Sequence, residues 1–157
     1  MSETLNPSVR ICQALESVVY IKDFAPSIIH CHYIHEDELQ NLTKPYLAII
    51  PQQMNIAGPG GALATQTTLD VTCGVTLQFV QRLDSVTTEA IDDMLQWVWL
   101  NMQRVRVAEL PGIEASFIQN SLRQEFAYSE PRLRELHVFD SRFSAAWRVA
   151  VDSGVLA

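Results

Sequence analysis

The sequence lacks the features that mark several common classes of protein. It has no run of about 20 apolar residues, which a membrane-spanning helix requires, and its polar opening, residues 1–7, does not resemble a signal peptide. Its cysteines number three, an odd count without paired spacing. We therefore expect neither a membrane-embedded protein nor a disulfide-bonded secreted domain, and we expect synthesis in a reducing cytoplasm.

Basic charge is also scarce. The 157 residues include 11 Lys and Arg against 18 Asp and Glu, which gives a formal net charge of −7. A surface of this sign repels phosphate backbones, so a conventional nucleic-acid-binding module is disfavoured. A chain of this length predicts one domain that buries roughly 70% of its unfolded surface, which is enough for stability without a disulfide or a structural metal.

Catalytic and ligand-binding motifs of real specificity are missing. His30, His32 and His35, together with Cys31, come nearest to a metal site. In a strand, however, Cys31 and His35 would point away from the face that His30 and His32 share. Solvated or interfacial histidines are thus the favoured reading, and we expect no metal, no cofactor and no enzymatic activity. The Gly-Pro-Gly-Gly run at 58–61 lacks the Lys-Ser/Thr that completes a phosphate-binding loop.

One long alternating segment, residues 67–81, stands out. Its apolar positions are Leu69, Val71, Cys73, Val75, Leu77 and Phe79, and between them lie Thr68, Asp70, Thr72, Gly74, Thr76 and Gln78. A period of two predicts a strand with one buried and one solvent-facing side. At about 3.3 Å per residue the twelve residues from Thr68 to Phe79 alone would span roughly 40 Å, far more than a usual strand. Strands of this kind tend to build walls and interfaces.

Further strands are predicted on either side of it. Residues 46–50 form a compact apolar run, and Pro51 either marks a sheet edge or ends the pairing. Residues 52–66 contain Gly and Pro without charge, and they predict an extended loop that is longer than a hairpin needs. Residues 115–128 are assigned as a strand on a weaker pattern, and alternation returns over residues 136–151.

Two helices complete the expected fold. Asn6 and Pro7 form a helix start, and apolar residues then recur at helical spacing up to Tyr20. A second helix begins at Thr87 or Thr88, and its apolar stripe consists of Ile91, Met94, Leu95, Val98 and Met102. The order of elements predicts an α+β fold in a single domain, with helices packed on one face of a mostly antiparallel sheet of about four strands.

This order of elements resembles that of bacteriophage tail terminator proteins, also called tail-completion proteins. The resemblance rests on residues 44–51 (K-P-Y-L-A-I-I-P), the alternating strand, the helix at 88–105 and above all residues 134–149. This last segment is an alternating strand that contains Trp147 and Arg148, as family members tend to have. The resemblance covers the N-terminal helix and most of the chain from residue 44 onward, while residues 30–38 have no counterpart in it.

Membership would imply a structural subunit that assembles into a homohexameric ring on the last ring of tail-tube protein, ends tube growth and offers a docking surface to the neck or head connector. The protein would be located in the virion after assembly in the host cytoplasm, with DNA only passing through the lumen. The alternatives are another neck or sheath-associated phage ring protein, an intracellular α+β ligand-binding dimer, and a metal-dependent enzyme that uses residues 30–37.

Candidate contacts with a second subunit or a partner follow from these features. They lie in the expected loop, on the polar side of the long strand, on the second helix and on the last strand, and they are Gln53, Asn55, Gln66, Thr68, Asp70, Thr72, Thr76, Trp97, Trp99, Arg142 and Arg148. Trp97 and Trp99 widen the apolar surface of the helix beyond one stripe. We therefore expect one of them to face a neighbouring subunit.

Overall fold

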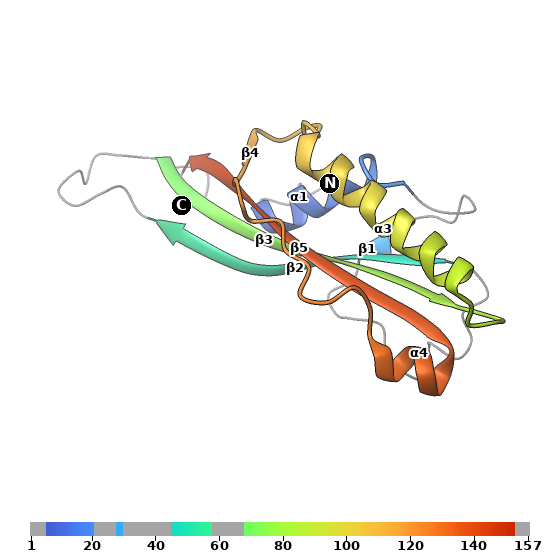
Figure 1. The fold of residues 1–157 in the computed structure, drawn as a ribbon. Coiled ribbons are helices and arrows are strands. Elements are labelled where there is room, and N and C mark those ends of the chain that lie inside the picture. Colours follow the sequence, from blue (N-terminus) through green and yellow to red (C-terminus); the bar gives the residue numbers. More distant parts are fainter. Residues whose placement is uncertain (1–5, 21–27, 30–44, 58–67, 153–157) are drawn as a thin grey trace.

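The computed structural model describes residues 6–20, 28–29, 45–57 and 68–152 (Figure 1). Its elements, in chain order, are α1 (Pro7–Glu16), β1 (Ile28–Ile29), β2 (Tyr46–Ala57), β3 (Thr68–Arg82), α3 (Thr88–Val107), β4 (Ala115–Phe117), α4 (Glu130–Leu136) and β5 (Val138–Asp152). The strands form one sheet in the order β1-β2-β3-β5-β4, in which only the pairing of β1 with β2 is parallel. The predicted α+β class is confirmed.

The sheet is built around an unbroken ladder between β3 and β5. Both strands have 15 residues, and every residue is paired, from Thr68 with Asp152 to Arg82 with Val138. At about 3.3 Å per residue such a strand spans about 50 Å, so the two strands cross the whole molecule (Figure 1). The long strand predicted for residues 67–81 is therefore confirmed, and β5 is its partner.

Helices α1 and α3 cover one face of this sheet (Figure 1). The side chain of Asn6 caps α1 by accepting hydrogen bonds from the backbone amides of Ser8 and Val9, at 2.9 and 3.3 Å. Thr87 caps α3 in the same way, by accepting from the amide of Ala90 at 3.1 Å. Helix α1 ends at Glu16, before the predicted end at residue 20, and a turn follows it.

The core lies between the helices and the apolar side of the ladder. Phe79 is at its centre, stacked on Phe143 of β5 with 5.4 Å between ring centroids and edge-on to Trp97 of α3 at 5.0 Å. Ile11 and Leu15 of α1 join the same cluster, fully buried. Aromatic pairs of this geometry are worth about 0.5–1.5 kcal/mol beyond the area they bury. This packing fixes α3 on the sheet.

The prediction for residues 52–66 is wrong in its first part. Strand β2 runs through Pro51 and on to Ala57, so residues 52–57 form strand and not loop, while residues 58–66 lie outside the described residues. The pairing changes register between Pro51 and Met54, which leaves Gln52 and Gln53 opposite one residue of β3. Proline is tolerated in a strand beside such a bulge, because the regular ladder is already interrupted there.

Gly74 is the residue of β3 that faces this bulge. A Cβ atom added to it would lie 3.6 Å from the backbone oxygen of Gln53, so the two backbones approach closely there. Beyond the bulge, Met54 and Ile56 pair with Cys73 and Val71 on the core side of the sheet, yet their exposed fractions are 40% and 57%. The far end of β2 and β3 projects past the helices (Figure 1), which explains this exposure.

The prediction of a strand at 115–128 is mostly wrong. Within it only β4, three residues long, forms a strand, and the chain then follows the edge of β5 irregularly. Helix α4 was not predicted at all; Ser129 caps it, and His137, in the left-handed region at φ 56°, ends it. Each end of α4 is therefore set by one residue.

Candidate interaction surfaces

The side of the sheet that points away from α1 and α3 carries most of the polar residues predicted from sequence. We call it the polar sheet face, and in the described part of the chain it includes Asp70, Thr72, Gly74, Thr76, Ser144, Ala146 and Arg148. The register aligns residues of adjacent strands across it, for example Thr72 of β3 with Arg148 of β5. Alternation along the two strands thus gathers these side chains on one surface.

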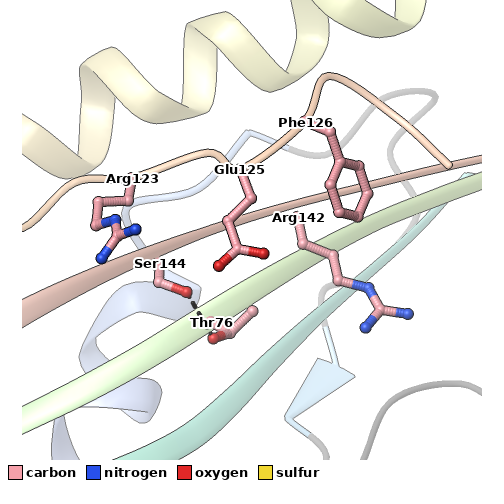
Figure 2. Close-up of a pocket in the computed structure, with 6 residues that line it drawn as sticks. All are labelled: Thr76, Arg123, Glu125, Phe126, Arg142 and Ser144. Carbon is pink, nitrogen blue, oxygen red and sulfur yellow. Dashed lines mark hydrogen bonds between the residues drawn. The ribbon is translucent and has the colours of Figure 1, made fainter.

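A hollow opens on this face, and we call it the arginine pocket (Figure 2). It has a cavity volume of about 260 Å³ and is lined by Thr76, Arg123, Glu125, Phe126, Arg142 and Ser144. The hydroxyl groups of Thr76 and Ser144 lie 2.9 Å apart and share a hydrogen bond on its floor. Arg123, Glu125 and Phe126 come from the irregular segment between β4 and α4, while the other three come from β3 and β5.

Backbone hydrogen bonds hold that irregular segment against the sheet. Arg123 and Ser144 form an isolated β-bridge in which each amide donates to the other residue's carbonyl oxygen at 2.8 Å. Further along, the amide of Ser129 donates to the carbonyl oxygen of Asp140 at 2.8 Å. Glu125 and Phe126 lie between these two attachments, so their positions over β5 are constrained at both ends.

A buried carboxylate fixes one wall of the pocket. Asp140 of β5 is only 2% exposed, and it binds Arg132 of α4 and Arg142, with 3.2 Å between the Arg142 Nη2 and Asp140 Oδ2 atoms. The Nε2 amide of Gln78 also donates to its Oδ1 atom at 3.2 Å. A buried carboxylate is tolerated only when it is paired and hydrogen-bonded. These contacts therefore fix the direction of the Arg142 side chain, which lines the pocket.

The sign of the charge at the pocket is unusual for this protein. Three arginines, Arg123, Arg132 and Arg142, lie in or beside it with two carboxylates, Glu125 and Asp140, which leaves one net positive charge. The chain as a whole has a net charge of −7. The arginine pocket is thus a locally basic spot that favours an acidic partner.

A second, shallower hollow lies further along the polar sheet face. It has a volume of about 400 Å³, and its lining residues are Asp70, Glu114, Ala115, Ser116, Arg148 and Ala150. The structure therefore brings together two of the predicted contacts, Asp70 and Arg148. Thr76 and Arg142, two others, line the arginine pocket, although Thr76 is only 5% exposed and offers a partner little surface.

The outer side of α3 is a different kind of surface. Trp99 is 56% exposed, and Leu100 and Val107 are exposed by 40% and 70% on the same side of the helix. Trp97 is 3% exposed instead, since it packs on Phe79 and donates from Nε1 to the carbonyl oxygen of Tyr20 at 2.8 Å. The prediction of Trp97 as an interface residue is therefore wrong, and Trp99 is the tryptophan available to a partner.

The remaining predicted residues are placed as follows. Gln53 and Asn55 are exposed on β2, Thr72 is half-buried on β3, and Thr68 is the first residue of β3. Gln66 lies outside the described residues, as do His30, His32 and His35. No sequence pattern pointed to Arg123 or Phe126, because their segment has no regular pattern and reaches the pocket only through tertiary contacts.

The two cysteines described by the structure, Cys12 and Cys73, are both buried, and neither forms a disulfide. Burial raises the pKa of the Cys73 thiol, which keeps it protonated at neutral pH. They act as small apolar side chains in the core, as their positions on apolar faces predict. Within the described ranges, no three His, Cys, Asp or Glu side chains are grouped as metal ligands. No helix within these ranges is long and apolar enough to cross a membrane.

Comparison with known proteins gives a likeness in fold to a solved structure. No protein family and no curated protein matches this sequence. Among solved structures, the chain is similar to the sheath/tube terminator of an extracellular contractile injection system, PVC, in its extended state, with a TM-score of 0.50 and 12% sequence identity. The match covers 97% of this chain and 58% of that one, so the chain spans little more than half the length of that terminator. At such low identity, the likeness establishes a similar fold.

Proposed function

We propose that this protein is a structural terminator subunit of a phage tail or a related tail-like particle. It forms a ring, a homohexamer, on the last ring of tube protein, stops tube growth and offers a docking surface to the neck or head connector. The observation that carries the proposal is the likeness in fold to a sheath/tube terminator over 97% of the chain. The order of elements in the sequence supports the same family independently.

Two features of the fold agree with a ring. A closed ring uses heterologous contacts, so each subunit needs two different complementary surfaces. The outer side of α3, with Trp99, and the polar sheet face, with the arginine pocket, are two such surfaces of different chemistry. The ladder of β3 and β5 is long and continuous enough to serve as a wall between neighbours.

The proposal gives the protein a structural role with no cofactor and no catalysis. Its partners are other copies of itself, the tube protein and a neck or connector protein, in a particle assembled in the host cytoplasm. DNA only passes through the lumen of the ring, which the net charge of −7 favours because an acidic surface repels phosphates.

A sheath-associated ring protein is the second candidate. The observation that favours it is that the similar solved structure is a terminator of both sheath and tube. Co-sedimentation separates the two candidates. Purified protein mixed with isolated tubes, or with isolated sheaths, should pellet with tubes if it caps the tube, whereas pelleting only with sheaths would favour the second candidate.

A ligand-binding dimer has less support. Pockets for small molecules usually measure about 300–1,000 Å³ and are lined mainly by apolar and aromatic side chains. The arginine pocket is smaller, at about 260 Å³, and Phe126 is the single aromatic residue among its six lining residues. The hollow at Asp70 and Arg148 is larger but has no aromatic lining residue.

Deletion of the gene tests the proposal directly. Particles from the deletion mutant should have tails or tubes of uncontrolled length that fail to join heads or their caps, as seen by electron microscopy of negatively stained lysates. Supplying the intact gene in trans should restore normal length. Tails of normal length that are joined normally in the deletion mutant would refute the proposed function.

A further inference from the structure

One side of α3 combines acidic and apolar side chains. We call it the acidic helix patch, and it consists of Asp92, Asp93, Gln96, Trp99 and Leu100, all of them exposed. No Lys or Arg occurs from Leu83 to Gln103, so no basic residue near in sequence offsets its charge. The patch lies on the outer side of α3, because the opposite side of the helix, with Met94, Trp97 and Val98, is buried against the sheet.

The arginine pocket offers the matching chemistry on the other side of the sheet. Arg123 is exposed and Arg142 is partly exposed, while Phe126, 54% exposed, adds an apolar surface on the Arg142 side of the pocket (Figure 2). Each surface therefore combines a net charge, negative on the helix patch and positive at the pocket, with an exposed aromatic ring. The acidic helix patch and the arginine pocket lie on opposite sides of one sheet, so they cannot meet within one copy of the chain.

We propose that the acidic helix patch of one subunit binds the arginine pocket of the next. Trp99 and Leu100 pack on Phe126 of the neighbour, while Asp92 and Asp93 pair with its Arg123 and Arg142. This inference rests on the proposed function and gives its ring a specific contact. The contact is heterologous, so an open chain of subunits has one free patch at one end and one free pocket at the other until the ring closes.

The proposed contact contains residue types that contribute strongly to binding at known protein interfaces. Tryptophan and arginine are among the residues most enriched at energetic hot spots of interfaces. Charge pairs across an interface also choose the partner and set the register of binding. Glu125 is the unfavourable element, because its carboxylate lies in the pocket and would face the acids of the neighbour. Replacement of Glu125 by Gln should therefore strengthen the contact.

Charge reversal tests the contact with two variants. One is the double variant Asp92→Lys and Asp93→Lys, which makes the helix patch basic. The other is Arg123→Glu, which makes the pocket acidic; Arg123 is chosen over Arg142 because Arg142 binds the buried Asp140. Neither variant should assemble alone, since its helix patch and its pocket then have charges of the same sign and repel each other. A 1:1 mixture should assemble, because each helix patch then finds a pocket of opposite charge on the other variant.

The measurement is sedimentation velocity over a range of concentrations, with circular dichroism to confirm folding. The unchanged chain and a control, Glu135→Lys on the exposed side of α4, should both assemble, and Glu125→Gln should assemble at lower concentration. The inference is overturned if the unchanged chain stays monomeric at every concentration, if either variant assembles alone as the unchanged chain does, or if the mixture fails to assemble. None of these results decides the tail phenotype, which the gene deletion tests separately.

Discussion

The side-chain amide of Asn101 forms hydrogen bonds with both backbone polar groups of Tyr20. Its Oδ1 accepts from the Tyr20 amide at 2.8 Å, and its Nδ2 donates to the Tyr20 carbonyl oxygen at 3.0 Å. A second donation from Nδ2, to the carbonyl oxygen of Trp97, is also 3.0 Å long. Asn101 is fully buried. This one side chain thus joins the chain that follows α1 to the middle of α3.

Replacement of Asn101 by Leu should therefore destabilise the protein although Leu is apolar and of similar size. The substitution leaves the Tyr20 amide without its acceptor, while the Tyr20 carbonyl oxygen keeps the bond from Trp97 Nε1, and an unsatisfied buried group costs about 1–3 kcal/mol. Urea denaturation followed by tryptophan fluorescence measures the loss. Gln103→Leu on the outer side of α3 is the control and should change the free energy of unfolding by less than about 0.5 kcal/mol.

The two tryptophans of α3 should behave oppositely. Trp97→Ala removes a ring that is 3% exposed, together with its contact to Phe79, and should cost about 3–5 kcal/mol of stability. Trp99→Ala removes a ring that is 56% exposed and should leave stability within about 0.5 kcal/mol. Thermal melts of both variants give the comparison. Equal losses would contradict the assignment of Trp97 to the core.

The difference between these tryptophans shows where sequence reasoning fails. The helix was predictable from its apolar stripe, but the stripe did not include Trp97 or Asn101. Asn101 is polar, and its burial depends on the backbone of Tyr20, far away in the sequence. A periodic pattern cannot anticipate such a partner. Alternation predicted the β3–β5 strands well, because each strand buries one side along most of its length.

The candidate site was predictable only in part, for a related reason. Thr76 and Arg142 belong to regular strands, in which side chains alternate between the two faces of the sheet. Their place on the polar sheet face could therefore be predicted. Gln78, on the same side, was expected to face solvent but is fully buried, since it donates to the buried Asp140. Arg123 and Phe126 occupy an irregular segment whose path is set by hydrogen bonds to β5. Those hydrogen bonds cannot be predicted from the residues of the segment alone.

His137 offers a test of the end of α4. It adopts φ 56° and ψ 33°, a left-handed conformation that costs a residue with a Cβ atom roughly 1–2 kcal/mol. Glycine adopts it without that cost. His137→Gly should therefore raise the free energy of unfolding by about 0.5–1 kcal/mol, because the relieved strain exceeds the cost of glycine's greater freedom in the unfolded chain, measured by urea denaturation. His137→Ala keeps the Cβ atom and should give no such gain.

The buried thiols give a prediction about pH. Cys73 is buried and the pKa of its thiol is raised, so the reactive thiolate is scarce at neutral pH and increases only at higher pH than for an exposed cysteine. In a Cys31→Ser variant, Cys12 and Cys73 should react with Ellman's reagent only slowly at pH 8 and fully in denaturant. Rapid reaction of two thiols in the native protein would contradict their burial.

The buried Asp140 and the two arginines that it binds, Arg132 and Arg142, should contribute far more to stability than an ion pair on the surface of the same region. Asp140→Asn removes the charge that Arg132 and Arg142 share, and loss of one partner of a buried ion pair costs about 3–5 kcal/mol. Arg134 and Glu135 of α4 provide the matched control, since their charged atoms are 3.9 Å apart and both side chains are 68% exposed.

Glu135→Gln should therefore change the free energy of unfolding by at most about 1 kcal/mol, because solvent screens an exposed pair. Urea denaturation of both variants at the same pH and salt concentration makes the comparison. Asp140→Asn should also loosen the hold on Arg142 and so disturb the arginine pocket, where Arg142 is a lining residue. A loss for Asp140→Asn no larger than that for Glu135→Gln would show that the cluster does not anchor α4 and the pocket to β5.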